Sequence, residues 1–232
     1  MNYRRSMIVV CLFFVVTSGW SQPPKRPGTS AALLVGEYMR DDYLDTLRAT
    51  GSPFASLRSG EPQLVIVKKS DGGRLLSTIL DFHQGGAEFR IPSAGPLQVQ
   101  IRAGFEMSNL HFEEVDPRHF KLGFDQFAAL GYTYVGDSSE YARRVLTGEY
   151  TDKRGKRYTF GSDGVADFDG MKFKYSIGLD QVLNRFDYFQ DDVRHEVIGF
   201  KRTSDTLPLF HTSGEISQYL DKSPYLVLRK IR

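Results

Sequence analysis

The chain has 232 residues, with 30 basic and 28 acidic side chains and one cysteine, Cys11. This near-neutral balance argues against a nucleic-acid-binding protein, because recognition of a phosphate backbone rewards a strong basic excess. No cysteine follows Cys11, so the rest of the chain has no disulfide, no thiol nucleophile and no cysteine-ligated metal.

Residues 1–22 have the three parts of a secretory signal peptide. Arg4-Arg5 precede an apolar run at residues 7–16, and small residues follow at 17–19. The run is too short to span a bilayer, which needs roughly 20 apolar residues, so we expect cleavage rather than anchoring. We therefore expect an exported protein, periplasmic or secreted, with no transmembrane segment after signal cleavage.

A proline-rich linker is predicted at residues 23–33, and a β-rich globular unit at residues 34–232. The first element of this unit is a short helix. Asp41 is placed to cap its N-terminus, and Gly51 is placed to end it. Its apolar face would carry Tyr43, Leu44 and Leu47.

Period-two alternation dominates the chain from residue 64 onward. A second short helix is expected at residues 215–221, and no alternation of strands with long helices is present, which disfavours a doubly wound sheet. The predicted fold is all-β, mainly an antiparallel meander, with one or two short helices. The predicted strands fall near residues 64–67, 75–80, 88–91, 97–102, 110–112, 120–124, 132–134, 158–160, 172–177, 185–188, 194–202, 207–209 and 225–231.

One pentamer occurs twice with a single change. Leu-Val-Gly-Glu-Tyr at residues 34–38 returns as Leu-Thr-Gly-Glu-Tyr at residues 146–150. If each copy opens a meander, the chain consists of two related β-units, with halves 34–145 and 146–232. The alternative is one lipocalin-like or calycin-like barrel with a chance repeat.

Residues 146–189 contain the pattern G-x-Y-x-D-x-x-G-x-x-Y-x-F followed by F-x-Y and D-Y. This stretch, with residues 43–54 and 81–86, resembles uncharacterised secreted proteins of the Bacteroidota over most of residues 34–232. That resemblance implies no particular chemistry. The Gly-x-aromatic start of each half is also similar to the lipocalin and calycin start, with Tyr38 or Tyr150 where that superfamily usually has tryptophan.

Few residues have a pattern that points to catalysis. Asp81 and His83 would share a face of a strand and could form a pair that orients a general base, beside Gly85-Gly86. A local turn with a hydrogen-bonded histidine explains the same residues. No serine lies in a recognisable nucleophile elbow.

Carboxylates and histidines give no metal motif. The acids at 163, 167 and 169 lack the alternation and the later glutamate of a calcium loop, which favours a polar hairpin turn. No two histidines have metal-ligand spacing. The acids at 180, 187, 191 and 192 suit glycosidase chemistry only at a suitable separation, and solvated turns also explain them. We expect no metal and no cofactor.

Aromatic residues in the second half alternate with polar ones on successive strands. We expect these rings to line the interior of a barrel, either as a ligand-binding surface or as packed core. The first functional hypothesis is a binding module for a small apolar or amphipathic ligand. The alternatives are an envelope protein-interaction or inhibitor module, and a hydrolase. The candidate ligand-binding residues are Tyr158, Phe160, Phe173, Tyr175, Phe186 and Tyr188.

Overall fold

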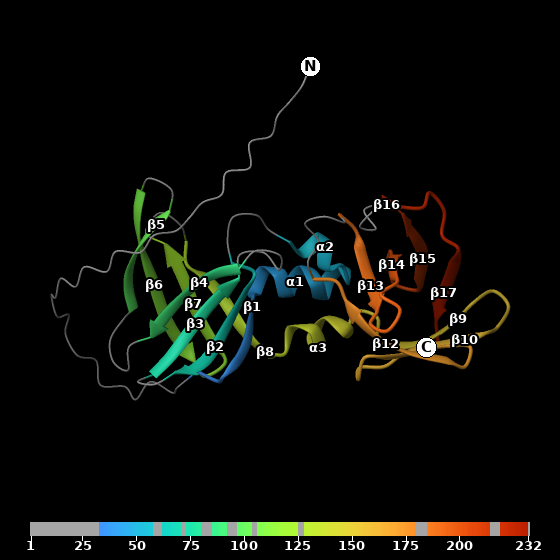
Figure 1. Cartoon of the computed structure of the whole chain (residues 1–232), viewed down its shortest axis with the longest axis horizontal. Helices are drawn as coiled ribbons and strands as arrows, with labels where there is room; N and C mark the ends of the chain where they lie inside the picture. The colour runs from blue at the N-terminus through green and yellow to red at the C-terminus, as the bar shows by residue number, and fades with distance from the viewer. Residues whose placement is uncertain are drawn as a thin grey trace, which may run out of the picture.

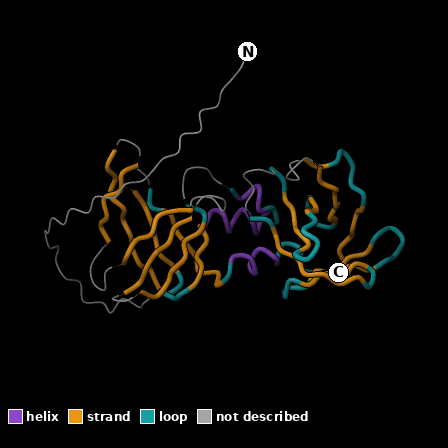
Figure 2. The backbone as a smooth tube through the Cα atoms, in the orientation of Figure 1, coloured by secondary structure: helices purple, strands orange, loops and turns teal. Residues whose placement is uncertain are grey.

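The computed structural model describes residues 33–57, 62–70, 73–79, 85–91, 97–103, 106–124, 128–179, 185–213 and 219–231. The predicted signal peptide lies outside these residues, as do Asp81 and His83. Strands gather at two ends of the molecule, and the helices lie between them (Figures 1 and 2). The predicted all-β class with short helices is confirmed.

The first group of strands forms an eight-stranded antiparallel barrel with the order β4-β3-β2-β1-β8-β7-β6-β5. Strand β1 pairs with both β2 and β8, so the first and last strands of the meander are neighbours. Its strands are β1 (Gly36–Arg40), β2 (Leu64–Ser70), β3 (Gly73–Ile79), β4 (Gly85–Ile91), β5 (Leu97–Ala103), β6 (Glu106–Asp116), β7 (His119–Phe124) and β8 (Leu130–Gly136).

The second group forms a curled antiparallel sheet, here called the second sheet. Its strands follow one another from β9 to β15, and β17 pairs with both β15 and β9, so the pairing returns to its first strand. These strands are β9 (Gly148–Thr151), β10 (Arg157–Phe160), β11 (Val165–Phe168), β12 (Met171–Ile177), β13 (Asp187–Asp191), β14 (Val197–Phe200), β15 (Thr206–Ser213), β16 (Tyr219–Leu220) and β17 (Leu226–Lys230).

The helices α1 (Asp41–Thr50) and α2 (Pro53–Ser56) connect β1 to β2, and α3 (Ser138–Arg143) connects the two groups of strands. The predicted end of α1 is confirmed, because Gly51 adopts a left-handed conformation at φ 65° and its N–H donates to the Leu47 carbonyl. The predicted cap is wrong. Arg40 occupies the N-cap position, and the Asp41 carboxylate instead accepts a hydrogen bond from Thr133 of β8 at 2.6 Å.

The short helix predicted at residues 215–221 is wrong at residues 219–220, which form a strand. Residues 214–218 lie outside the described residues, and Tyr219–Leu220 form β16, paired with Ser213 and Thr212 of β15. The Leu220 side chain lies against the backbone of Gly199, where a Cβ would be 2.1 Å from it. Packing on the outer face of β14 therefore selects an extended conformation here.

The repeated pentamer adopts the same local structure in both copies. Gly36 has φ 139° and Gly148 has φ 149°, a region that disfavours side chains, so both positions require glycine. The Tyr38 hydroxyl donates to the Leu34 carbonyl at 3.0 Å, and the Tyr150 hydroxyl donates to the Leu146 carbonyl at 2.8 Å. Each meander thus opens with a tyrosine that is bonded to the carbonyl four residues before it.

The two groups of strands share a core. Helix α1 lies between two strands of the first barrel, yet its Tyr43, Leu44 and Leu47 are buried in the same cluster as residues of the second sheet. The first barrel keeps a separate cluster around Tyr38 and Phe120. The second group of strands is therefore completed by a helix that belongs, in chain order, to the first.

Removal of either tyrosine hydroxyl should destabilise the protein. Tyr38→Phe removes the hydroxyl that donates to the Leu34 and Pro117 carbonyls, and Tyr150→Phe removes the donor of the buried Leu146 carbonyl. We expect a loss of about 1 kcal/mol in unfolding free energy for each. Urea denaturation followed by circular dichroism measures it. Tyr219→Phe is the matched control because that ring is 64% exposed. Equal effects in all three variants would contradict the shared role of the two tyrosines.

Candidate functional site

The second sheet has two different ends. At one end, here called the helix end, the Asp187 carboxylate accepts from the Phe54 N–H of α2 at 2.8 Å, and Arg202 packs over Gly51. The other end, here called the far end, carries the turns 152–156, 169–170 and 192–196. Helices cover the helix end, and the far end lies away from them (Figure 1).

The interior of the second sheet is occupied by its own aromatic side chains. Phe160 is the centre of this packing: edge-to-face contacts at 5.4 to 5.8 Å join its ring to Tyr150, Tyr175, Phe168 and Phe189. Phe160, Tyr175 and Phe189 are 2%, 1% and 0% exposed. The candidate ligand residues Phe160 and Tyr175 are therefore core residues in this structure.

Phe186 and Tyr188 are on the opposite face. Tyr188 pairs with Gly199 and packs its ring over Gly178, and Phe186 contacts Tyr188 at 6.2 Å. The expectation that all six rings share one side is wrong for these two. Phe189, which the sequence analysis missed, takes the inward position on β13. The inward residues of β13 are Asp187, Phe189 and Asp191, and the two aspartates break the apolar alternation there.

Aromatic side chains also gather at the far end. Phe168 contacts Tyr158 at 5.2 Å and Phe173 at 5.1 Å, and His211 stacks on Tyr225 at 4.0 Å with an interplanar angle of 17°. Tyr158 is buried, Phe168 and Phe173 are half-buried, and Tyr225 is 43% exposed. We call these five residues the aromatic rim: Tyr158, Phe168, Phe173, His211 and Tyr225.

The hydroxyl groups of the rim lie near charged side chains of both signs, with the Lys156 ammonium as well as carboxylates acting on Tyr158. Burial, and then the nearby Glu196 carboxylate and Tyr158, raise the pKa of Tyr225 to about 12. Burial and the Asp152 carboxylate raise the pKa of Tyr158, whose hydroxyl donates to Asp152 at 3.3 Å. Tyr225 is 43% exposed, so part of its side chain supplies surface at the rim.

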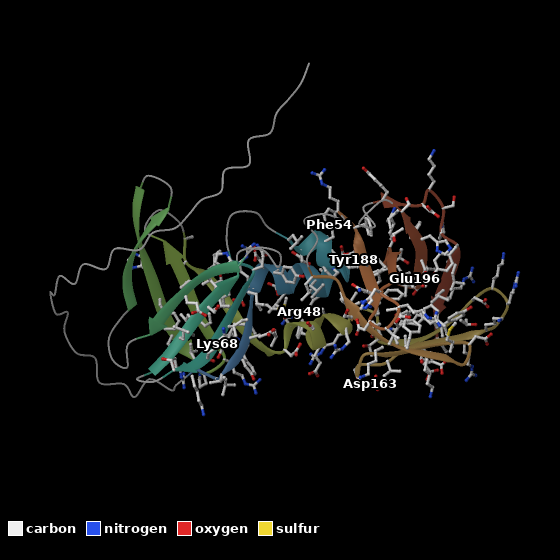
Figure 3. The ribbon with its side chains drawn as sticks, in the orientation of Figure 1. Arg48, Phe54, Lys68, Asp163, Tyr188 and Glu196 are labelled. Atoms are coloured by element: carbon white, nitrogen blue, oxygen red, sulfur yellow. The ribbon has the colours of Figure 1, made fainter. Side chains whose placement is uncertain are left out.

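At the helix end, Asp187 joins the second sheet to α2. This carboxylate is 9% exposed, accepts from Ser52 and from the Phe54 N–H, and lies near Tyr43 of α1. Burial raises its pKa above the usual range for a carboxyl, and the two hydrogen bonds oppose that shift only in part. Figure 3 shows Phe54 and Tyr188 at this junction.

Most of the other aspartates considered as candidates accept backbone N–H groups in turns. Asp163 accepts from the Val165 N–H, Asp167 from the Gly170 N–H, and Asp191 from the Val193 and Arg194 N–H groups. Asp192 accepts from the Ser176 hydroxyl at 2.7 Å. Asp180 lies outside the described residues. Within the described ranges, no group of three or more His, Cys, Asp or Glu side chains could hold a metal ion.

The structure brings no two histidines together as partners among the residues it describes. His119 bonds to Asp116 at 2.8 Å, His195 contacts Gln190 at 3.3 Å, and His211 belongs to the rim. The Asp81 and His83 pair lies outside the described residues. The histidine the structure brings to the candidate site is His211, for which the sequence offered no spacing signal.

A shallow surface depression with no room for a ligand lies near the helix end, between Arg202 and Lys230. Tyr150 contributes to its lining, but the Tyr150 hydroxyl already donates to the Leu146 carbonyl. The aromatic rim, by contrast, exposes rings and carboxylates. We therefore take the rim as the candidate functional site.

Comparisons with known proteins assign no relative: no family model, no curated protein and no solved structure matches this chain. The resemblance to secreted proteins of the Bacteroidota and to lipocalins therefore stays a prediction. In the part of the chain that the structure describes, no helix has the length and apolar character needed to cross a membrane.

The buried carboxyl of Asp187 should make stability depend on pH. Because its folded-state pKa is raised, the stability it contributes is fully present below the ordinary carboxyl pKa and is lost as pH rises through the folded-state pKa. Asp187→Asn keeps an acceptor for the Phe54 N–H and removes the buried charge. We expect this variant to be at least as stable as wild type at about pH 7.5, with an advantage that shrinks as pH falls.

Urea denaturation across the range from about pH 4 to 7.5 measures this difference. Asp192→Asn is the matched control, because Asp192 is an exposed acid on the next turn. An Asp187→Asn advantage that stays constant across this range, or grows toward acid pH, would rule out the assignment.

Because Phe189 faces inward on β13, truncating it should destabilise the protein far more than truncating the exposed Val193. Phe189→Ala should lose about 3–5 kcal/mol of unfolding free energy, because it opens a cavity beside Phe160 and Tyr175. Val193→Ala should change it by less than about 0.5 kcal/mol, because Val193 is 71% exposed. Thermal or urea unfolding of both variants checks the contrast, which fails if Phe189→Ala has a small effect.

Proposed function

We propose that this protein is an exported binding module that takes a small amphipathic ligand across the aromatic rim of the second sheet. The observation that carries the proposal is the difference between the two ends of this sheet. The helix end is packed against α1 and α2, whereas the far end presents exposed rings. Export rests on the signal peptide predicted at residues 1–22.

The filled interior determines where a ligand would lie. Phe160, Tyr175 and Phe189 pack together at the centre of the sheet, so a ligand would have to displace core rings to enter there. Such displacement would be costly, because packed cores resist changes of even one methylene group. Binding across the rim, with an apolar part against the rings, avoids this cost.

The rim has both kinds of contact that an amphipathic ligand needs. The stacked rings of His211 and Tyr225 and the edges of Phe168 and Phe173 provide apolar and π surface. The exposed Glu196 carboxylate, which acts on Tyr225, provides a hydrogen-bond acceptor near them. A ligand with a short apolar chain and a polar head would satisfy both.

Binding of octanol to the full chain tests this proposal. We expect Tyr225→Ala to weaken octanol binding by about tenfold in ligand-observed NMR titrations, since the ring contributes roughly 1.4 kcal/mol of apolar contact. Phe54→Ala is a matched control, because Phe54 is a similarly exposed aromatic at the other end, 39% against 43%. No octanol binding, or equal weakening in both variants, would contradict the proposal.

A protein partner is the second candidate function, and one observation favours it. Val193 and Met171 are 71% and 48% exposed on neighbouring turns of the far end, and the Arg194 side chain reaches the Met171 sulfur at 3.0 Å. Exposed apolar side chains at the end of a sheet with a filled interior suit docking. Under this alternative, Val193→Asp would abolish cross-linking to an envelope protein, and octanol would not bind to wild type.

A further inference from the structure

Strand β17 lacks a neighbour along part of one edge. Its ladder with β15 contains four residue pairs. Its ladder with β9 contains two, Arg229 opposite Thr151 and Lys230 opposite Tyr150. Among the residues that the structure describes, no strand pairs with residues 226–228 on the β9 side. We call this stretch the open edge of β17.

Strand β9 leaves β17 because the chain turns at Asp152. The Asp152 carboxylate accepts from the Arg154 and Lys156 N–H groups at 2.8 and 3.0 Å, and the Asp152 N–H donates to the Lys156 carbonyl at 3.1 Å. Lys153, which would continue the ladder opposite Val227, is therefore part of the turn. Figure 1 shows the turn between β9 and β10 extending away from β17.

The backbone of Val227 directs its polar groups toward the open edge. In an antiparallel sheet, consecutive residues direct their N–H and C=O groups to opposite edges. The Lys230 N–H donates to the Asp205 carbonyl on the β15 side at 3.0 Å, and the Ile231 N–H donates to the Glu149 carbonyl on the β9 side at 2.8 Å. Val227 is in phase with Ile231, so its N–H and C=O face the β9 side, where no described residue bonds to them.

Basic side chains lie beside the open edge. Lys153 and Arg154 are exposed on the turn, and Arg229 is exposed where β17 and β9 separate. The acid of the turn, Asp152, already accepts from two backbone N–H groups and from the Tyr158 hydroxyl. Three cationic groups are therefore available to a partner at this end of the open edge.

We propose that the open edge binds an extended acidic segment of a partner protein, which adds a short antiparallel strand to β17. An uncovered strand edge is a template for such pairing, and here the Val227 N–H and C=O would bond to the added backbone. Glu196 acts on Tyr225 beyond the other end of the open edge, so the partner's acids belong at the Arg229 end. This interaction uses the backbone of β17 and does not depend on ligand binding by the rim.

Three pentapeptides separate backbone pairing from charge, each titrated into the full chain and followed by NMR. The acidic probe is acetyl-Glu-Glu-Val-Thr-Val-amide, whose acids lie at the Arg229 end in an antiparallel arrangement. We expect it to bind about tenfold tighter than the same peptide with lysines in place of the glutamates. The acidic probe with N-methyl groups on its three central residues should not bind, because these amides cannot donate to Val227.

Two substitutions separate the backbone of Val227 from its side chain. Val227→Pro removes the N–H at the open edge and spares the β15 ladder, because this N–H points away from β15. It should weaken the acidic probe by about fivefold or more, the effect of one lost hydrogen bond. Val227→Ala keeps the N–H and should bind within about twofold of wild type. Urea unfolding checks both folds, and if Val227→Pro does not fold, the N-methylated probe decides.

Charge variants test the chemistry of the partner. Arg154→Gln and Arg229→Gln should each weaken the acidic probe by about two- to threefold, and by less in about 0.5 M sodium chloride. Lys174→Gln is the matched control, because Lys174 is an exposed base on β12, away from the open edge. Equal weakening in all three variants would report the net charge of the chain and would overturn the inference.

Three further results would also contradict it: equal binding of the acidic and basic probes, binding of the N-methylated probe as tight as that of its parent, or wild-type affinity in a folded Val227→Pro variant. None of these results concerns octanol at the rim. The inference and the proposed function can therefore fail independently.

Discussion

The packing of α1 against the helix end of the second sheet is the contact on which the rest of this structure depends. The helix follows β1 and precedes β2, so it belongs to the first barrel in chain order. Its Tyr43, Leu44 and Leu47 nevertheless fill the base of the other group of strands. One short amphipathic helix therefore joins the two meanders, although the first barrel also keeps a separate core cluster.

That contact also decides which surface is left for function. The helices cover one end of the second sheet, and Asp187 fixes α2 there through the Phe54 N–H. The interior is taken up by Phe160 and the rings around it. What stays accessible is the far end, where rings of graded burial meet carboxylates. The interior site that the sequence suggested is filled by core rings, and the accessible rings lie at the rim.

The aspartates of the second half have structural roles that explain their positions. Carboxylates are frequent in the second half, but Asp163, Asp167 and Asp191 each accept backbone N–H groups within hairpin turns. Those hydrogen bonds shape the turns and leave the carboxylates little freedom to act on a substrate.

The sequence by itself determined the all-β class and the end of α1 at Gly51, because these features depend on local preferences: alternation and a left-handed glycine. It also contained the repeated pentamer, but left open whether the repeat was structural or due to chance. Only the tertiary structure decided the rest. The Asp41 carboxylate bonds to Thr133 of a distant strand instead of capping α1. On β13, two buried aspartates face inward, Asp187 bonded to α2 and Asp191 to the following turn, so Phe189 rather than Tyr188 shares their face. The His211–Tyr225 stack likewise joins strands whose neighbourhood no local pattern encodes, because sheet pairing between them is a long-range choice.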